Sequence, residues 1–376
     1  MAPPPPEVTE AGGAAGRRGA FPVAGCTLGA GSLARQKWVL AVLSLGFLVQ
    51  YSGPLAVAAV LLTCLAGFAT LHTAWGRQAL GATLIHCVLF AGFYLFCWRL
   101  RSTDLMRALQ THGLSFFVFL RHVSFVVEVC GGAAISLNNY LCFLVFYPGA
   151  SGPLGSPEVY ADFARRNLVG PRHQDYPLAA RKVIVGALQV WAAHRLPISI
   201  ERVLDSPTTL LLWLNSLLLF VRVAFFGMGA WSFIEATALL YGWRLQPNFR
   251  GLLTRQNPSE FWWAWRGSLT NWLVRYVYGP LGASHRHQSL NILAAFTASM
   301  IWHWLALPFW APDFRAIMLL PITAWCVINA VAVVGHVNFR RLRLPTLTWI
   351  PLPCRRAVKI ALTGCLGSFS ATLPSF

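Results

Sequence analysis

One histidine stands out in a long apolar stretch in the last third of the chain. Residues 291–304 read NILAAFTASMIWHW, and His303 is the one ionisable residue among them. Polar side chains at membrane depth cost free energy and usually mark a site. A neutral imidazole within reach of a hydroxyl can take its proton while the oxygen attacks a carbonyl carbon. His303 is therefore the first candidate for a general base.

An aromatic and basic segment before this stretch carries further polar candidates. Residues 258–282 read PSEFWWAWRGSLTNWLVRYVYGPLG and include Arg266, Asn271 and Arg275. An arginine stays protonated and cannot act as a base, but it can stabilise an oxyanion or hold a phosphate of a donor. The structural alternative is that Arg266 rests on lipid phosphate in an interfacial anchor, which would also explain most of the aromatic residues.

The composition indicates that the chain folds in lipid. It has 376 residues, of which 56% are hydrophobic and 11% charged, whereas soluble domains carry about 25% charged residues. Lipid cannot satisfy the edges of open sheets. We therefore predict an all-α, polytopic helical membrane protein with roughly 8–11 membrane helices, some segments being re-entrant or interfacial.

The net charge of +18 rests on 30 Lys and Arg against 12 Asp and Glu. A nucleic-acid partner fits poorly with this hydropathy, and we predict none. Basic loops on anionic lipid headgroups are the favoured explanation, and a basic mouth for an anionic donor such as a coenzyme A thioester is the alternative.

Several other histidines, cysteines and charges inside apolar runs are interpreted as structural. Nine cysteines show no close pair and no metal-ligand spacing, so we predict neither a disulfide framework nor a metal site. His86 is interpreted as a satisfied core or interface histidine. Arg121 and Glu128 are seven residues apart and share one helix face, which favours an ion pair inside the bundle.

The chain divides into three parts. Residues 1–35 are rich in Pro, Gly and Ala and are predicted to be a disordered tail. Residues 36–350 are predicted to form the membrane domain, and residues 351–376 a short C-terminal segment. Within the domain we expect an interfacial segment at 181–202 and two helices, 207–226 and 228–243, that meet at a glycine pair.

Five stretches, in chain order, resemble signatures of the membrane-bound O-acyltransferase (MBOAT) superfamily, and together they mark a core at residues 113–304. They are GLSFF (Gly113–Phe117), YPGASGP (Tyr147–Pro153), YGWRLQPNFRGLL (Tyr241–Leu253), FWWAWRGSLTNWLVRYVYGPLG (Phe261–Gly282) and IWHW (Ile301–Trp304).

This resemblance implies a funnel-shaped helical core that moves an acyl group from a thioester, with acyl-CoA as the expected co-substrate, to a hydroxyl or amine. The acceptor would be a lipid, a protein or a polysaccharide, and no permanently bound cofactor is expected. The family's catalytic histidine corresponds to His303, and its second motif residue corresponds to Arg266. We predict that Asn271, Arg275 and Trp302 contact the donor.

Departures from the family pattern leave alternatives open. Arg266 replaces the usual His, Asn or Asp, and Trp304 replaces the usual Gly. A catalytically inactive regulator, scaffold or transporter on the same fold is the alternative function. The motifs look closer to the Hedgehog acyltransferase and GPI-remodelling branch than to the alginate-acetylating and D-alanyl-transferring branch. The predicted location is the bacterial cytoplasmic membrane or the endoplasmic reticulum, as a multi-pass protein.

Overall fold

A computed structural model of the chain describes residues 53–99, 105–145, 157–168, 174–199, 205–206, 208–282, 287–310 and 319–341, with short pieces between 42 and 50 and between 353 and 363. Every regular element in these ranges is a helix, beside one isolated bridge between Phe249 and Trp265. This confirms the all-α class. The predicted tail at 1–35, the motif at 147–153 and most of the segment 351–376 lie outside the described residues.

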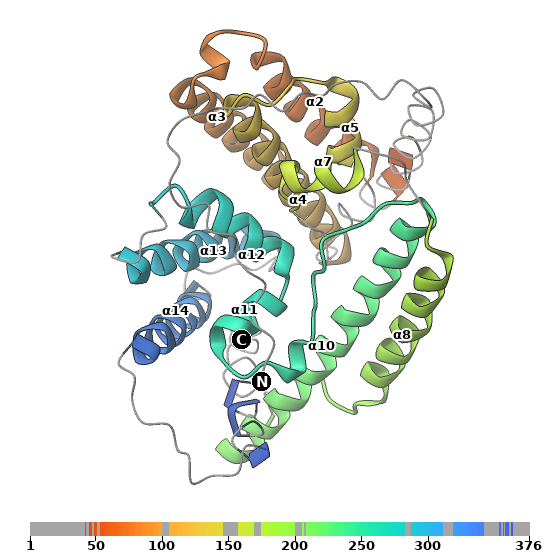
Figure 1. Cartoon of the computed structure of the whole chain (residues 1–376), viewed down its shortest axis with the longest axis vertical. Helices are drawn as coiled ribbons and strands as arrows, with labels where there is room; N and C mark the ends of the chain where they lie inside the picture. The colour runs from red at the N-terminus through yellow and green to blue at the C-terminus, as the bar shows by residue number, and fades with distance from the viewer. Residues whose placement is uncertain are drawn as a thin grey trace.

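The first group of helices comprises α2 (Pro54–Thr70), α3 (Ala79–Arg99), α4 (Leu105–Cys130), α5 (Leu137–Val145) and α7 (Tyr160–Asn167), with a short turn η1 (Trp75–Arg77). Figure 1 shows them together in the upper part of the molecule. Helix α4 is central, because α2, α3, α5 and α7 all contact it. The group packs around aromatic residues such as Phe68, Phe125 and Tyr140, which are almost fully buried.

The second group comprises α11 (Pro258–Ala264), α12 (Gly267–Leu273), the π-helix η4 (Val274–Tyr278), α13 (Gln288–Trp310) and α14 (Leu319–Arg341). Helix α13 contacts α14, η4 and also α4, so it joins the two groups. Helices α11 and α12 have seven residues each. Such a helix is only about 10 Å long, too short to cross a hydrocarbon core of about 30 Å.

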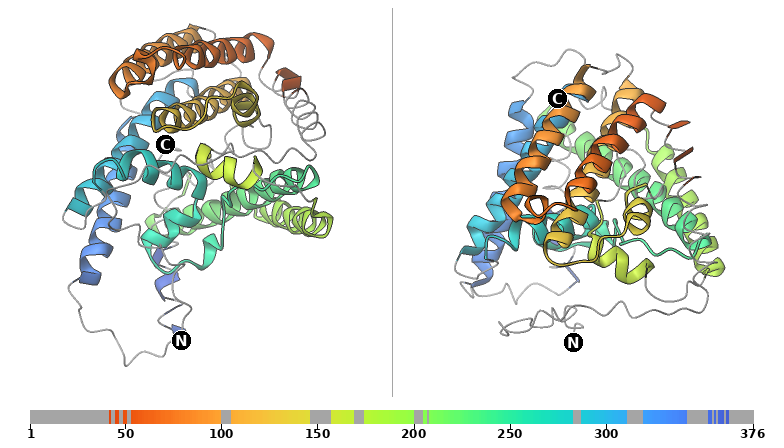
Figure 2. Two further views of the ribbon diagram at one scale, coloured as in Figure 1. Left: turned by 45° about the horizontal axis from the view of Figure 1, so that its top comes forward. Right: turned by 90° about the horizontal axis from the view of Figure 1, so that it is seen from above.

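A hairpin of α8 (Tyr176–Arg195) and α10 (Thr209–Leu240) forms the third part. The two helices run side by side in Figures 1 and 2. The prediction of two helices meeting at Gly227 and Gly229 is wrong, because α10 is one continuous helix of 32 residues. These glycines serve packing instead: Gly227 faces the Phe249 ring and Gly229 faces α8.

Two helices have the length and apolar character needed to cross a membrane, within the part of the chain that the structure describes. They are Leu210–Leu240, with a mean hydropathy of 2.0, and Ile322–Phe339, with a mean hydropathy of 1.6. The helices at Pro54–Thr70 and Gly81–Leu95 are apolar but shorter.

The α8–α10 contact depends on two glycines that face each other. A Cβ added to Gly229 would lie 2.7 Å from Val190 Cγ2 and 2.8 Å from the Gly186 carbonyl oxygen. We expect Gly229→Val to separate the helices and to lower stability by about 1–3 kcal/mol. The matched control is Gly92→Val in α3, where no heavy atom lies within 4 Å of an added Cβ. Thermal unfolding in detergent measures both, and equal melting temperatures would contradict the packing role.

Candidate functional site

His303 is held in a defined tautomer by its own helix. Its Nδ1 lies 2.7 Å from the carbonyl oxygen of Ser299, one turn earlier in α13. Because a carbonyl oxygen only accepts, Nδ1 carries the proton and Nε2 carries the lone pair. The ring meets Trp325 of α14 edge-on, with centroids 4.9 Å apart. Nε2 is therefore the ring nitrogen that can accept a proton.

Arg266 occupies the turn between α11 and α12 in a strained backbone conformation. Its φ of 52° is in the left-handed region, and it is the one residue other than glycine with positive φ among those described. Such strain costs about 1–3 kcal/mol and persists only where surrounding structure enforces it. Two contacts hold this turn: the Gly267 amide donates to the Asn248 carbonyl oxygen at 2.8 Å, and Phe249 bridges to Trp265.

The side chain of Arg266 extends toward α4 and α13. Its guanidinium carbon lies 5.1 Å from the centre of the Phe117 ring, and Phe117 in turn contacts Trp302, with ring centroids 5.8 Å apart. The Arg266 charge is near enough to act electrostatically on His303. The fold thus brings the two predicted catalytic residues, Arg266 and His303, to the same region, although 37 positions separate them in the chain.

An apolar cavity of about 350 Å³ lies in this region. Helices α3, α4, α12 and α13 and the π-helix η4 supply its walls, with Phe90, Phe119, Trp272 and Trp302 among the lining side chains and Ser299 as a rare polar one. Of the residues predicted to contact the donor, Trp302 is therefore the one that lines the cavity. A volume near 350 Å³ is at the lower end for small-molecule sites.

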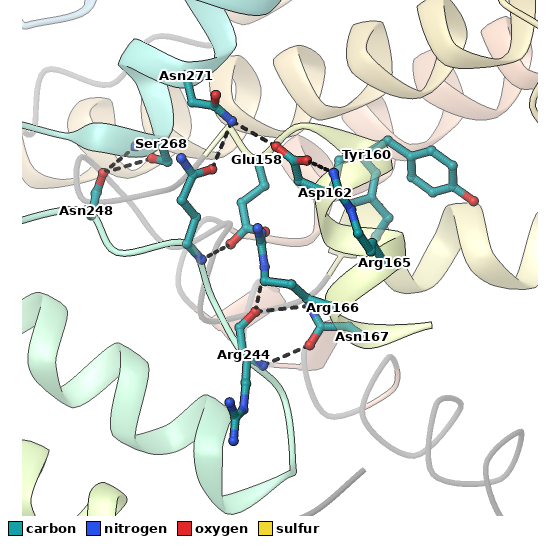
Figure 3. Close-up of polar contacts among 12 residues, drawn as sticks. Glu158, Tyr160, Asp162, Arg165, Arg166, Asn167, Arg244, Asn248, Ser268 and Asn271 are labelled. Atoms are coloured by element: carbon teal, nitrogen blue, oxygen red, sulfur yellow. Dashed lines mark hydrogen bonds and ion pairs between the residues drawn. The ribbon is translucent and has the colours of Figure 1, made fainter. Parts of the chain in front are cut away.

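A network of polar side chains lies on another side of α12 (Figure 3). Glu158 is fully buried. Its carboxylate accepts one hydrogen bond from the Arg166 guanidinium at 2.6 Å and one from the backbone N–H of Gln246 at 3.0 Å. Asn167 completes a two-way bridge, since it accepts from the Arg244 amide at 2.8 Å and donates to the Arg244 carbonyl oxygen at 3.1 Å. These contacts attach α7 to the chain that follows α10.

The same network contains Asn271, which was predicted to contact the donor. Its Nδ2 donates to Asp162 at 3.0 Å and to the Gln246 side chain at 3.3 Å. Ser268 donates to Asn248 at 2.8 Å. Asn271 is thus engaged in positioning α12 against α7 (Figure 3). This network was not predicted from the sequence. One of its members, Asn248, stands in the Asn-Phe pair of the motif YGWRLQPNFRGLL, which is its one sign in the sequence.

Tyr160, at the start of α7, lies at the edge of this network in Figure 3. Burial, with a smaller contribution from the charge of Glu128, raises the pKa of the Tyr160 phenol to about 12. The phenol therefore stays protonated at neutral pH.

Arg275 lies away from the cavity in a second cluster. Its guanidinium pairs with Glu128 at 3.1 Å, and Tyr276 donates to the same carboxylate at 3.2 Å. The predicted ion pair between Arg121 and Glu128 is replaced by this contact, while Arg121 donates to the Phe143 carbonyl oxygen at 3.2 Å. The reason is tertiary: η4 presents a cation to Glu128, and the end of α5 presents carbonyl groups to Arg121.

Comparisons with known proteins identify similar sequences. The profile of the MBOAT, membrane-bound O-acyltransferase family, matches residues 73–342. A probable alginate O-acetylase AlgI of Pseudomonas syringae pv. tomato is 26% identical over 254 residues, which cover 61% of this chain and 48% of that protein. The membrane-bound O-acyltransferase GUP1 of Millerozyma farinosa is 36% identical over 66 residues, 15% of this chain and 13% of that protein.

Further relatives show the same two groups. The AlgI of Pseudomonas aeruginosa is 26% identical over 257 residues, which cover 61% of this chain and 48% of that protein. The gup1 protein of Schizosaccharomyces pombe is 36% identical over 81 residues, 21% of this chain and 14% of that protein. The chain thus spans about half the length of the alginate O-acetylases it matches and a smaller part of the GUP1 proteins.

Proposed function

The chain belongs to the membrane-bound O-acyltransferase family, and on that premise we propose that it transfers an acyl group from a thioester donor to a hydroxyl or amine. The family is membrane-embedded, and the chain is an integral membrane protein. We propose acyl-CoA as the donor, several membrane crossings, and a lipid, protein or polysaccharide as the acceptor. Relatives named as alginate O-acetylases favour a hydroxyl as the acceptor group.

The observation that carries this proposal is the tautomer of His303. With Nδ1 donating to the Ser299 carbonyl oxygen, Nε2 is the atom that takes a proton from the attacking hydroxyl. The hydroxyl oxygen then bonds to the thioester carbon, the carbon–sulfur bond breaks, and the thiolate leaves. The proton on Nε2 passes to the leaving sulfur, which regenerates the neutral imidazole.

Arg266 has a second role in this proposal. A guanidinium is always protonated, so it supplies positive charge where the carbonyl oxygen becomes negative during attack. The left-handed turn and the Phe117 ring restrict where that charge lies. This role gives a physical use to the strain at Arg266 and accommodates an arginine where the family pattern has His, Asn or Asp.

The apolar cavity supports an acyl chain longer than acetyl. Each buried CH₂ contributes about 0.8 kcal/mol, so an almost entirely apolar wall binds a longer acyl chain more tightly than an acetyl group. The cavity borders Trp302, the immediate neighbour of His303. A chain held there would present its thioester close to the proposed base.

Filling the cavity tests this part of the proposal. We expect Ala298→Phe, at a lining position, to lower kcat/KM for long-chain acyl-CoA by about tenfold or more while acetyl-CoA is affected less. The matched control is Ala91→Phe, at an exposed position on α3. Thiol release from a panel of acyl-CoAs measures both. A uniform loss for all chain lengths would contradict an acyl-chain role for the cavity.

The same panel tests the activity itself. Purified protein in detergent, supplied with labelled acyl-CoA and membrane extract, is expected to release thiol and to label an acceptor. Acyl-CoA binding without any turnover would instead favour the alternative of an inactive regulator.

A further inference from the structure

The first turn of α12 is capped by a residue from another segment of the chain. Arg266 stands immediately before α12, where a Ser, Thr, Asp or Asn side chain usually accepts a hydrogen bond from a free amide of the helix. A guanidinium has no acceptor atom, and the Arg266 side chain makes no such bond. By contrast, α8, α10 and α11 are capped by their own preceding residues, Asp175, Thr208 and Asn257. The start of α12 therefore depends on an acceptor from elsewhere.

Asn248 supplies this acceptor to two successive amides. Its backbone carbonyl oxygen accepts from the Gly267 amide at 2.8 Å, and its side-chain Oδ1 accepts from the Ser268 amide at 3.3 Å. The same Oδ1 accepts from the Ser268 hydroxyl at 2.8 Å (Figure 3). Asn248 and Ser268 are each 1% exposed, so these bonds are shielded from water. One residue thus satisfies the first two amides of α12, which have no partner inside the helix.

The residues on either side of this asparagine hold the same turn. Phe249 forms an antiparallel bridge with Trp265. A Cβ added to Gly267 would lie 3.0 Å from the Pro247 carbonyl oxygen, so the two segments are in close contact there. Both residues that flank Arg266 are therefore fixed from outside, which is the kind of surrounding structure that a strained left-handed residue needs.

We propose that Asn248 is a positioning residue for acyl transfer, whose side chain fixes the turn so that the Arg266 guanidinium meets the negative charge that develops on the carbonyl oxygen. The inference rests on the proposed function of Arg266. An arginine side chain is long, so a small rotation of its backbone displaces the guanidinium much further. A misplacement of about 1 Å can lower a rate by about 10²-fold. Asn248 acts through Arg266, and no contact with the substrate is assigned to it.

A double-mutant cycle between Asn248 and Arg266 tests this role. Asn248→Ala removes the Oδ1 contacts, and we expect it to lower kcat by about 10–100-fold and to change KM for acyl-CoA by less than about threefold. In an Arg266→Ala background there is no guanidinium to position, so the same substitution should change kcat by less than about threefold. Single-turnover thiol release from the four proteins measures the cycle. Equal losses of kcat in both backgrounds overturn the proposal.

The matched control is Asn167→Ala, which removes another buried asparagine that bonds to the backbone of the same segment. Asn167 is 2% exposed and bridges the Arg244 amide and carbonyl oxygen. This variant should lower the melting temperature as Asn248→Ala does, but it should lower kcat by less than about threefold. A loss of kcat as large as that of Asn248→Ala would assign the effect to general loosening of the segment and overturn the proposal.

A milder variant keeps the test decisive if Asn248→Ala fails to fold. Ser268→Ala removes only the hydroxyl that donates to Asn248, and the Ser268 amide remains bonded. We expect kcat to fall by about three- to tenfold with a melting temperature near that of wild type. A wild-type kcat in Ser268→Ala then overturns the positioning role. Absence of turnover in the wild-type protein is a different result, because it overturns the proposed acyl transfer itself and this role with it.

Discussion

Replacing His303 with alanine is expected to lower kcat for acyl transfer by about 10²–10⁴-fold, the usual contribution of a positioned general base. The variant lacks the Nε2 lone pair that the Ser299 contact orients. Donor binding should change much less, because Trp302 and the other cavity residues remain. Single-turnover thiol release and acyl-CoA binding, measured on the same preparation, separate the two effects.

The matched control for this experiment is His72→Ala, which removes an exposed histidine outside the site. It should keep wild-type turnover and melting temperature. If His303→Ala also keeps wild-type turnover, His303 is not the base, and the assignment by family motif is wrong for this chain. If it loses turnover together with its fold, His303→Gln, which is closer in size, is the variant to compare.

Replacing Glu158 with alanine is expected to destabilise the protein by about 3 kcal/mol. Its carboxylate is fully buried and accepts from both Arg166 and the Gln246 amide. Without it, a largely buried guanidinium and a backbone N–H lose their acceptor. The contact between α7 and the segment after α10 should weaken. Because α12 is bonded to both, it should also be held less firmly.

An exposed arginine on α7, seven positions after Glu158, provides the comparison. Arg165 is 76% exposed and pairs with Asp162, so Arg165→Ala should cost less than about 1 kcal/mol. Thermal unfolding in detergent compares the variants, and hydrogen exchange reports on α7 directly. Equal melting temperatures for the two variants would mean that the Glu158 network contributes little to stability.

The class of the protein and the identity of its proposed base were determined by sequence alone. An apolar composition with few charges leaves helices as the way to satisfy backbone groups in lipid. His303 was identifiable because an ionisable residue in an apolar run is costly and therefore informative. Both inferences depend on local composition, which can be assessed without knowing the contacts between helices.

Contacts between distant segments were not predictable in this way. Glu128 is paired with Arg275, 147 positions later, rather than with Arg121 on its own helix. Asn271, which is predicted to contact the donor, also joins α12 to α7 through Asp162, and the sequence gives no sign of this contact. Gly227 and Gly229 were predicted to separate two helices, but they allow close packing within one. Local patterns are ambiguous at such positions, because the same residue type can end a helix, make a packing contact or belong to a binding site.

The sequence by itself therefore determined an all-α membrane fold, the family resemblance and the candidate base. Only the tertiary structure decided which nitrogen of His303 carries the lone pair, that Arg266 reaches the same region, and that Asn248 caps the start of α12. The physical reason is that hydrophobicity and motif spacing are properties of single segments. Partners, tautomers and cavities depend on several helices that only folding brings together.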